Sequence, residues 1–107
     1  MIRTIAVLTV IAGPAIAEIA DPGEAAALWG MALELEEVCP DRWIAPAGND
    51  AADREIAFEA MMAARELIPA ARATSRARIE DLGCDAARRE VADRFALAPD
   101  EFWQPAQ

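Results

Sequence analysis

The side chains of this protein that could take part in a reaction are almost all carboxylates. The 107-residue chain contains 19 Asp and Glu residues but no histidine and no tyrosine, and its only serine is Ser75. A catalytic serine needs a base beside its hydroxyl, and the usual bases, histidine and lysine, are both missing. Paired carboxylates can act as acid and base in glycosidases, but they need a deep cleft, which a domain of about 90 residues rarely builds. We therefore predict that the protein is not an enzyme.

The densest group of carboxylates surrounds a cysteine and does not form a metal-binding pattern. The group consists of Glu34, Glu36, Glu37 and Asp41, with Cys39 among them. On a helix these positions point in several directions, so their oxygens do not converge on one ion. The sequence also lacks the glycine-rich loops that hold phosphate groups and the carboxylate spacing of a calcium loop. We predict neither a metal site nor a cofactor.

Four residues are candidates for contact with a partner protein. They are Glu36, Trp43, Phe102 and Trp103. The three aromatic residues lie in a predicted loop and in the C-terminal tail, where such side chains either cover a small core or anchor a partner. Glu36 lies close to the apolar face of its predicted helix. There it can pair with an arginine such as Arg88 or Arg89, or contact the partner.

The N-terminus has the three parts of a bacterial secretory signal. Arg3 is followed by an uncharged, largely apolar run over residues 4–17, in which the letters GP break the run ahead of AIA. Small residues at the first and third positions of AIA match what signal peptidase accepts. We expect residues 1–17 to be a cleaved signal peptide and residues 18–107 to form a single domain, periplasmic or secreted. The alternatives are an uncleaved anchor, although spanning a membrane takes about 20 apolar residues, and an N-terminal helix buried in the domain.

Cys39 and Cys84 are the only cysteines, and we expect them to form one disulfide. An exported chain with an even number of cysteines most simply pairs them, and two cysteines allow one pairing. The bond would close a loop of about 45 residues, for which chain-entropy estimates give about 4 kcal/mol of stabilisation. A redox-active pair would more typically be close in sequence. The predicted role of the disulfide is therefore structural.

Composition and local signals predict an all-α fold. Glycine is scarce, and Ala, Glu, Arg and Leu dominate the sequence. We expect the first helix at residues 22–39, with Asp21 as its N-cap, a proline at its first position and Pro40 at its end. Trp29 has the spacing of a core residue on this helix. The same spacing turns Cys39 toward the core.

A loop at residues 40–50 and a second helix at residues 51–67 are expected next. The loop contains prolines, a glycine and turn-forming Asn and Asp. Asp50 is the predicted cap of the second helix. Its apolar face is broad, which favours a central position in the fold. Pro69 is expected to end or kink this helix.

Two more helices complete the predicted fold. The third is expected at residues 70–82, with Arg72 and Arg76 on its outer face and a glycine at its end. The fourth is expected at residues 86–96, with Asp85 as N-cap and the second cysteine turned inward. The chain is thus predicted to form a small bundle of about four short helices, stapled by one disulfide.

The charge balance bears on the possible partners. The net charge is −9, and such a field repels nucleic acids and anionic membrane surfaces. We expect no nucleic-acid binding, and membrane contact only if the N-terminal segment is retained. A small exported helical domain without catalytic groups most simply works by binding another protein, as an accessory subunit, an inhibitor or an assembly factor.

The overall plan also resembles one known group of proteins. A cleaved signal, a short helical domain and one long-loop disulfide are similar to the acid-stress chaperones of enteric bacteria, although the tryptophan-containing loop and the absence of lysine depart from them. The resemblance implies a periplasmic chaperone that is activated at low pH, where the many carboxylates lose their charge below about pH 4. A further alternative is the exported domain of a membrane complex, held by an uncleaved N-terminal helix.

Overall fold

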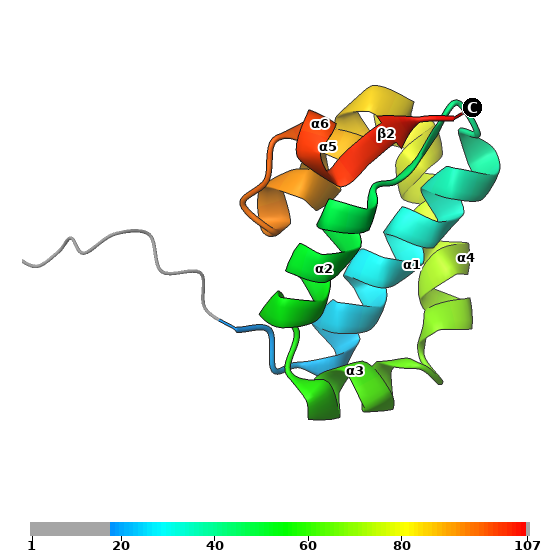
Figure 1. The fold of residues 1–107 in the computed structure, drawn as a ribbon. Helices are drawn as coiled ribbons and strands as arrows, with labels where there is room; N and C mark the ends of the chain where they lie inside the picture. The colour runs from blue at the N-terminus through cyan, green and yellow to red at the C-terminus, as the bar shows by residue number, and fades with distance from the viewer. Residues whose placement is uncertain (1–17, 107) are drawn as a thin grey trace, which may run out of the picture.

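The computed structural model describes residues 18–106, which are mostly helical (Figure 1). The elements are α1 (Pro22–Val38), β1 (Arg42–Ile44), α2 (Pro46–Glu55), α3 (Phe58–Ala64), α4 (Ile68–Leu82), α5 (Cys84–Arg94), α6 (Pro99–Phe102) and β2 (Trp103–Pro105). The helical fold class is confirmed, but this range holds six helices rather than about four, together with two short strands. The predicted signal peptide lies outside the described residues.

Helix α1 is the central element of the domain. Asp21 caps it as predicted, because its carboxylate accepts hydrogen bonds from the backbone N–H groups of Gly23 and Glu24 at 3.4 and 3.2 Å. The helix contacts α3, α4, α5 and β1, and it lies between α2 and α4 in Figure 1. Trp29 packs against the core from a partly buried position, and Leu35 is fully buried. The prediction that the helix after residue 50 is central is therefore wrong.

Residues 51–67 do not form one helix, and the interruption is at Ile56. Ile19 forms a parallel bridge with Ile56. The N–H of Ile19 donates to the carbonyl of Glu55 at 2.7 Å, and the N–H of Ala57 donates to the carbonyl of Ile19 at 2.9 Å. These bonds require an extended backbone at Ile56, so α2 ends at Glu55 and α3 begins at Phe58. A contact distant in sequence thus overrides the local helical pattern.

Helix α2 begins inside the segment that was predicted to be a loop. Its N-cap is Ala45, and Pro46 takes the first helical position, for which its fixed φ is suited. Asp50 lies inside the helix and does not cap it. Gly48 allows α2 to approach α6 closely, since a Cβ atom at this position would lie 2.9 Å from backbone atoms of Phe102.

Helices α4 and α5 follow the prediction more closely. Pro69 lies in the first turn of α4, and Ser75 and Ile79 of this helix are buried in the core. Gly83 ends α4 with a φ of 88°, a conformation that glycine adopts without strain. Gly83 is also the N-cap of α5, so Asp85 lies in the first turn of that helix and is not its cap.

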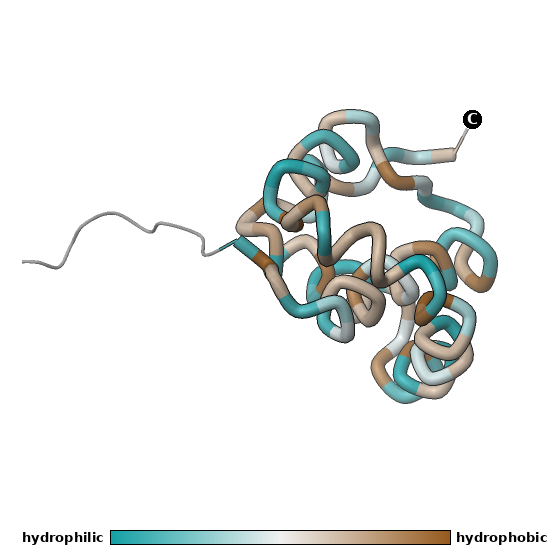
Figure 2. Tube along the Cα trace, turned by 90° about the horizontal axis from the view of Figure 1, so that it is seen from below, coloured by the Kyte–Doolittle hydropathy of each residue, from teal (hydrophilic) through white to brown (hydrophobic). Residues whose placement is uncertain are grey.

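The disulfide between Cys39 and Cys84 is present, with their Cα atoms 6.1 Å apart. It joins the end of α1 to the start of α5. Hydrophilic and hydrophobic residues alternate along the helices in Figure 2, as expected for helices with one buried and one exposed side. Every helix in residues 18–106 is too short or too polar to span a lipid bilayer.

Strands β1 and β2 form a two-stranded antiparallel ribbon that the sequence analysis does not predict. The register pairs Arg42 with Pro105, Trp43 with Gln104 and Ile44 with Trp103. The ribbon brings the segment after α1 onto the C-terminal tail. Together with α6 and the first turn of α5, the ribbon forms one end of the domain, which we call the ribbon end.

Candidate protein-binding surface at the ribbon end

The four predicted partner-binding residues converge on the ribbon end. Glu36 extends from α1 to β1, where its carboxylate accepts a hydrogen bond of 2.9 Å from the backbone N–H of Ile44. Its predicted pairing with Arg88 or Arg89 is therefore wrong, because this carboxylate holds the backbone of β1. Ile44 is in turn paired with Trp103 across the ribbon.

Phe102 and Trp103 are part of the core and support the ribbon from behind. Phe102 has no exposed surface, and Trp103 is 3% exposed. The ring of Phe102 stacks on Phe95 at 5.6 Å between centroids and meets Trp103 edge to face at 5.0 Å. The indole N–H of Trp103 donates to the carbonyl of Arg88 at 3.0 Å. These two residues take the covering role foreseen for aromatic side chains in the tail.

Trp43 is the aromatic candidate that remains exposed, with 47% of its surface accessible. Successive side chains of a strand point to opposite faces, and Ile44 faces the core. Trp43 therefore projects from the outer face of the ribbon, opposite Gln104 in the register. A large apolar ring is thus held at the surface by a rigid scaffold.

The outer edges of the ribbon are poorly suited to pairing with another strand. In β1 the outward N–H of Ile44 is occupied by Glu36. In β2 the N–H of Trp103 donates to the carbonyl of Pro99, and Pro105 has no N–H to offer. Occupied donors and edge prolines are typical protections against strand addition. Recognition at this end would therefore use side chains rather than a β-strand supplied by the partner.

Arg88 organises the polar contacts of the ribbon end. Its side chain is buried, with 5% of the residue exposed, and it donates to the carbonyl of Cys39 at 2.8 Å and to Asp41 at 2.6 Å. A third hydrogen bond, of 3.3 Å, goes to Asp85. The hydrogen bond from Arg88 lowers the pKa of Asp41, and the charge of the guanidinium acts in the same direction. Arg88 therefore ties the disulfide region to the ribbon.

A small pocket lies beside Arg88 at the ribbon end. Its volume is about 190 Å³, and it is lined by Arg42, Asp85, Arg88, Arg89, Pro99, Asp100 and Trp103. Pockets for small-molecule ligands typically measure about 300 to 1,000 Å³. This pocket is smaller, so its size suits one side chain or one chain end.

The sequence analysis missed the most deeply buried carboxylate, Glu34. Glu34 is 4% exposed on α1 and accepts hydrogen bonds from Arg72 at 3.0 Å and Arg76 at 2.6 Å on α4. Arg72 also pairs with Glu37. Burial alone raises the pKa of Glu34, but hydrogen bonds and charges from Arg76 and Arg72 outweigh burial and lower it. The two arginines therefore lie at the α1–α4 interface and not on a free outer face.

A signal for the Glu34 site was present in the sequence. Glu34 follows Ala26 and Gly30 at intervals of four, so all three lie along one side of α1. Small residues at that spacing indicate a close helix contact. A carboxylate at the next position of this spacing becomes buried when the two helices meet. It must then be paired with a cation or a hydrogen-bond donor.

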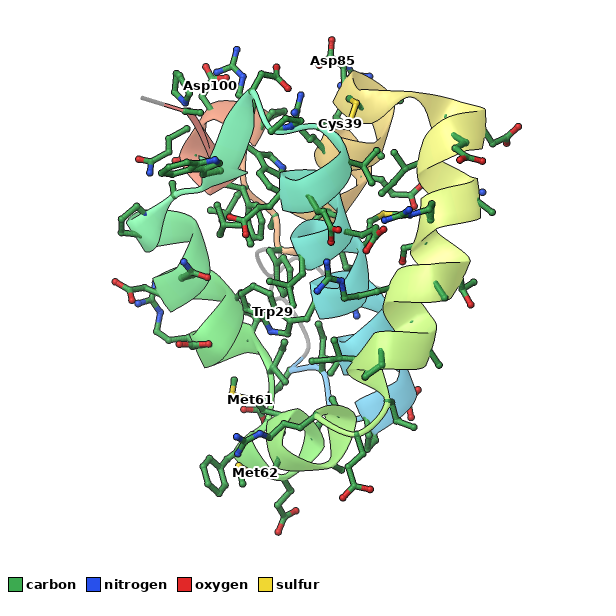
Figure 3. All side chains as sticks on the ribbon, turned by 90° about the vertical axis from the view of Figure 1, so that its right-hand side faces the viewer. Trp29, Cys39, Met61, Met62, Asp85 and Asp100 are labelled. Carbon is green, nitrogen blue, oxygen red and sulfur yellow. A yellow bond between two sulfur atoms is a disulfide. The ribbon has the colours of Figure 1, made fainter. Side chains whose placement is uncertain are left out.

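The opposite end of the domain carries a second group of exposed apolar residues. Phe58 and Met62 on α3 are 73% and 45% exposed, and Leu67 after α3 is 45% exposed. Figure 3 shows Met62 at the end of the molecule away from Cys39, Asp85 and Asp100. We call this group the α3 end.

Among residues 18–106, no cluster of three or more His, Cys, Asp or Glu side chains has the arrangement of a metal site. Comparison of the chain with known protein families, characterised proteins and solved structures finds no match.

Proposed function

We propose that the protein is exported and works by binding another protein through its ribbon end, as an accessory subunit, an inhibitor or an assembly factor. The observation that carries the proposal is the half-exposed indole of Trp43 on a ribbon supported by Phe102 and Trp103. Tryptophan is over-represented among residues that dominate binding energy, and a rigid scaffold lowers the entropy cost of binding. Trp43 is the proposed anchor.

Export is supported by the position of Ile19 relative to the expected cleavage site after Ala17. Ile19 is 2% exposed and bonded to both sides of Ile56. Cleavage after Ala17 would leave this attachment intact and would place the new amino group at Glu18, which is exposed. The disulfide is compatible with an oxidising compartment.

The direct test compares Trp43→Ala with Phe58→Ala in a pull-down from the native host's cell envelope. Each substitution removes an exposed aromatic ring, and the two rings lie at opposite ends of the domain. We expect Trp43→Ala to weaken the partner's binding about 30-fold, which corresponds to about 2 kcal/mol for a hot-spot residue. Phe58→Ala should stay within about twofold of the unmodified protein. Retention of the partner by Trp43→Ala would contradict the proposal.

A chaperone-like role is the second candidate, and the α3 end favours it. Exposed Phe58, Met62 and Leu67 provide apolar surface of the kind that binds unfolded chains. In the same experiment this role would make Phe58→Ala the damaging substitution. It would also make the protein suppress aggregation of an unfolded client near pH 3 in a light-scattering assay.

A further inference from the structure

We propose that the pocket at the ribbon end, beside Arg88, receives a carboxylate of the partner protein. The inference rests on the proposed function, because it specifies the chemistry of the surface that Trp43 anchors. Arg42 precedes Trp43 in β1 and lines the pocket, so the pocket and the indole both belong to the ribbon end, although the two side chains leave the strand on opposite faces.

The arginines around the pocket differ in how far their charges are already paired. Arg88 is bonded to two carboxylates, those of Asp41 and Asp85, so its single positive charge is fully paired. Arg42 and Arg89 are exposed and form no ion pair with any residue in the described part of the chain. Within residues 18–106, two guanidinium groups at the pocket therefore have no ion-pair partner, and guanidinium is the side-chain group best matched to a carboxylate.

The remaining lining residues favour an acidic group on an apolar stem. Trp103 and Pro99 provide apolar surface. The charged lining residues are Arg42, Arg88 and Arg89 against Asp85 and Asp100, so the lining has one more cation than anions although the protein as a whole carries −9. Nε of Arg88 is buried and is the one such side-chain atom in residues 18–106 without a hydrogen-bond partner.

The size of the pocket limits which carboxylate-bearing groups can enter it. A volume of about 190 Å³ fits a Glu or Asp side chain or the C-terminus of a chain better than a cofactor. Both sources present the same group to Arg42 and Arg89. A test must therefore include both.

The test uses the oxidised protein labelled with ¹⁵N and follows the indole N–H signals of Trp103 and Trp43 by NMR. Three peptides serve as probes: a peptide capped at both ends that contains two glutamates, its glutamine counterpart, and a peptide without charged side chains whose C-terminal carboxylate is free. We expect a saturable shift of the Trp103 signal with the glutamate peptide and none with the glutamine peptide. A shift with the third peptide alone would support the carboxylate site and identify a chain end as its occupant.

Matched arginine variants make the result specific to the pocket. The double variant Arg42→Gln/Arg89→Gln should weaken binding of the acidic peptide about tenfold or more, because charge-assisted hydrogen bonds are lost. The control is Arg54→Gln/Arg65→Gln, whose arginines are exposed, form no ion pair in the described range and lie in α2 and just after α3. It should leave binding unchanged.

Equal weakening by the two double variants, equal binding of the glutamine peptide, or no shift with any peptide would overturn the carboxylate site. The proposed function fails by a different result, namely partner binding that survives Trp43→Ala. Loss of the partner in Trp43→Ala without any peptide shift would therefore remove the carboxylate site and leave protein binding at the ribbon end in place.

Discussion

At the scale of single residues, Glu34 shows how a buried charge is tolerated in this small domain. Its carboxylate is removed from water, and it is compensated by two arginines from α4 that remain partly in solvent. Burial and pairing act on its pKa in opposite directions, and pairing prevails, so the pKa is lowered. The folded protein therefore holds Glu34 ionised more strongly than the unfolded chain does.

This difference predicts how stability depends on pH. A carboxylate with a lowered pKa stabilises the fold above its unfolded pKa, and this contribution is lost as pH falls through the folded pKa. Glu34 and Asp41 both have lowered pKa values, so stability should be level near neutrality and decline below about pH 4. Glu34→Gln should lose about 1 to 3 kcal/mol at pH 7 and show a shallower acid decline. Urea unfolding at pH 7 and pH 3 measures both effects, and an equally steep decline in the variant would contradict the role of Glu34.

Some residue roles could be predicted from the sequence because they do not depend on how distant segments pack. The cap at Asp21 depends on its own helix, and the disulfide follows from having two cysteines in one chain. Glu36 was correctly placed near the core side of α1, but its partner is a backbone N–H that only the ribbon creates. Sequence spacing cannot identify a partner that depends on long-range chain packing.

At the scale of elements, the close approach of α1 and α4 sets the geometry of the Glu34 site. Gly30 faces Ala71, and a Cβ atom at Gly30 would lie 2.7 Å from the Ala71 Cβ and 3.1 Å from the α4 backbone. Gly23, near the start of the same helix, has its nearest atom at 3.5 Å, on the flexible side chain of Asp21. Gly30 and Gly23 are therefore a matched pair of positions for substitution in α1, one in close contact with α4 and the other not.

We predict opposite outcomes for alanine at these two positions. Gly30→Ala gains about 1 kcal/mol of helix propensity but must push α4 away, with a net loss of about 1 to 2 kcal/mol. Gly23→Ala should be neutral or slightly stabilising, within about 0.5 kcal/mol. Thermal and urea unfolding of both variants measure the difference. A Gly30→Ala variant as stable as Gly23→Ala would mean that the helices are not in close contact.

The elements that were mispredicted share one physical cause. The segment after Pro40 has prolines and a glycine, which favour a loop, yet its backbone pairs with the C-terminal tail and then enters α2. Likewise, the helical pattern after residue 50 is broken by hydrogen bonds to Ile19, which is far away in sequence. Local propensity predicts the type of most helices, and long-range pairing decides where these segments start and stop.

At the scale of the whole molecule, the disulfide stabilises a domain with a thin core. A domain of about 90 residues, the size of the described range 18–106, buries only a little over half of its unfolded surface, so its stability margin is small. The bond connects residues 45 positions apart and lies beside Arg88, which holds Asp41 and the start of the ribbon. Oxidation therefore supports both the fold and the proposed binding surface, and the disulfide is compatible with an oxidising compartment.

The most direct measurement is the intact mass of the protein from a cell-envelope extract, alkylated without prior reduction. We predict a mass that begins at Glu18, is two hydrogens lighter than the reduced chain and carries no alkyl group, because Cys39 and Cys84 are bonded. A mass that includes residues 1–17 would contradict cleavage of the predicted signal. Alkylation of both cysteines would contradict the stapled domain on which the ribbon end depends.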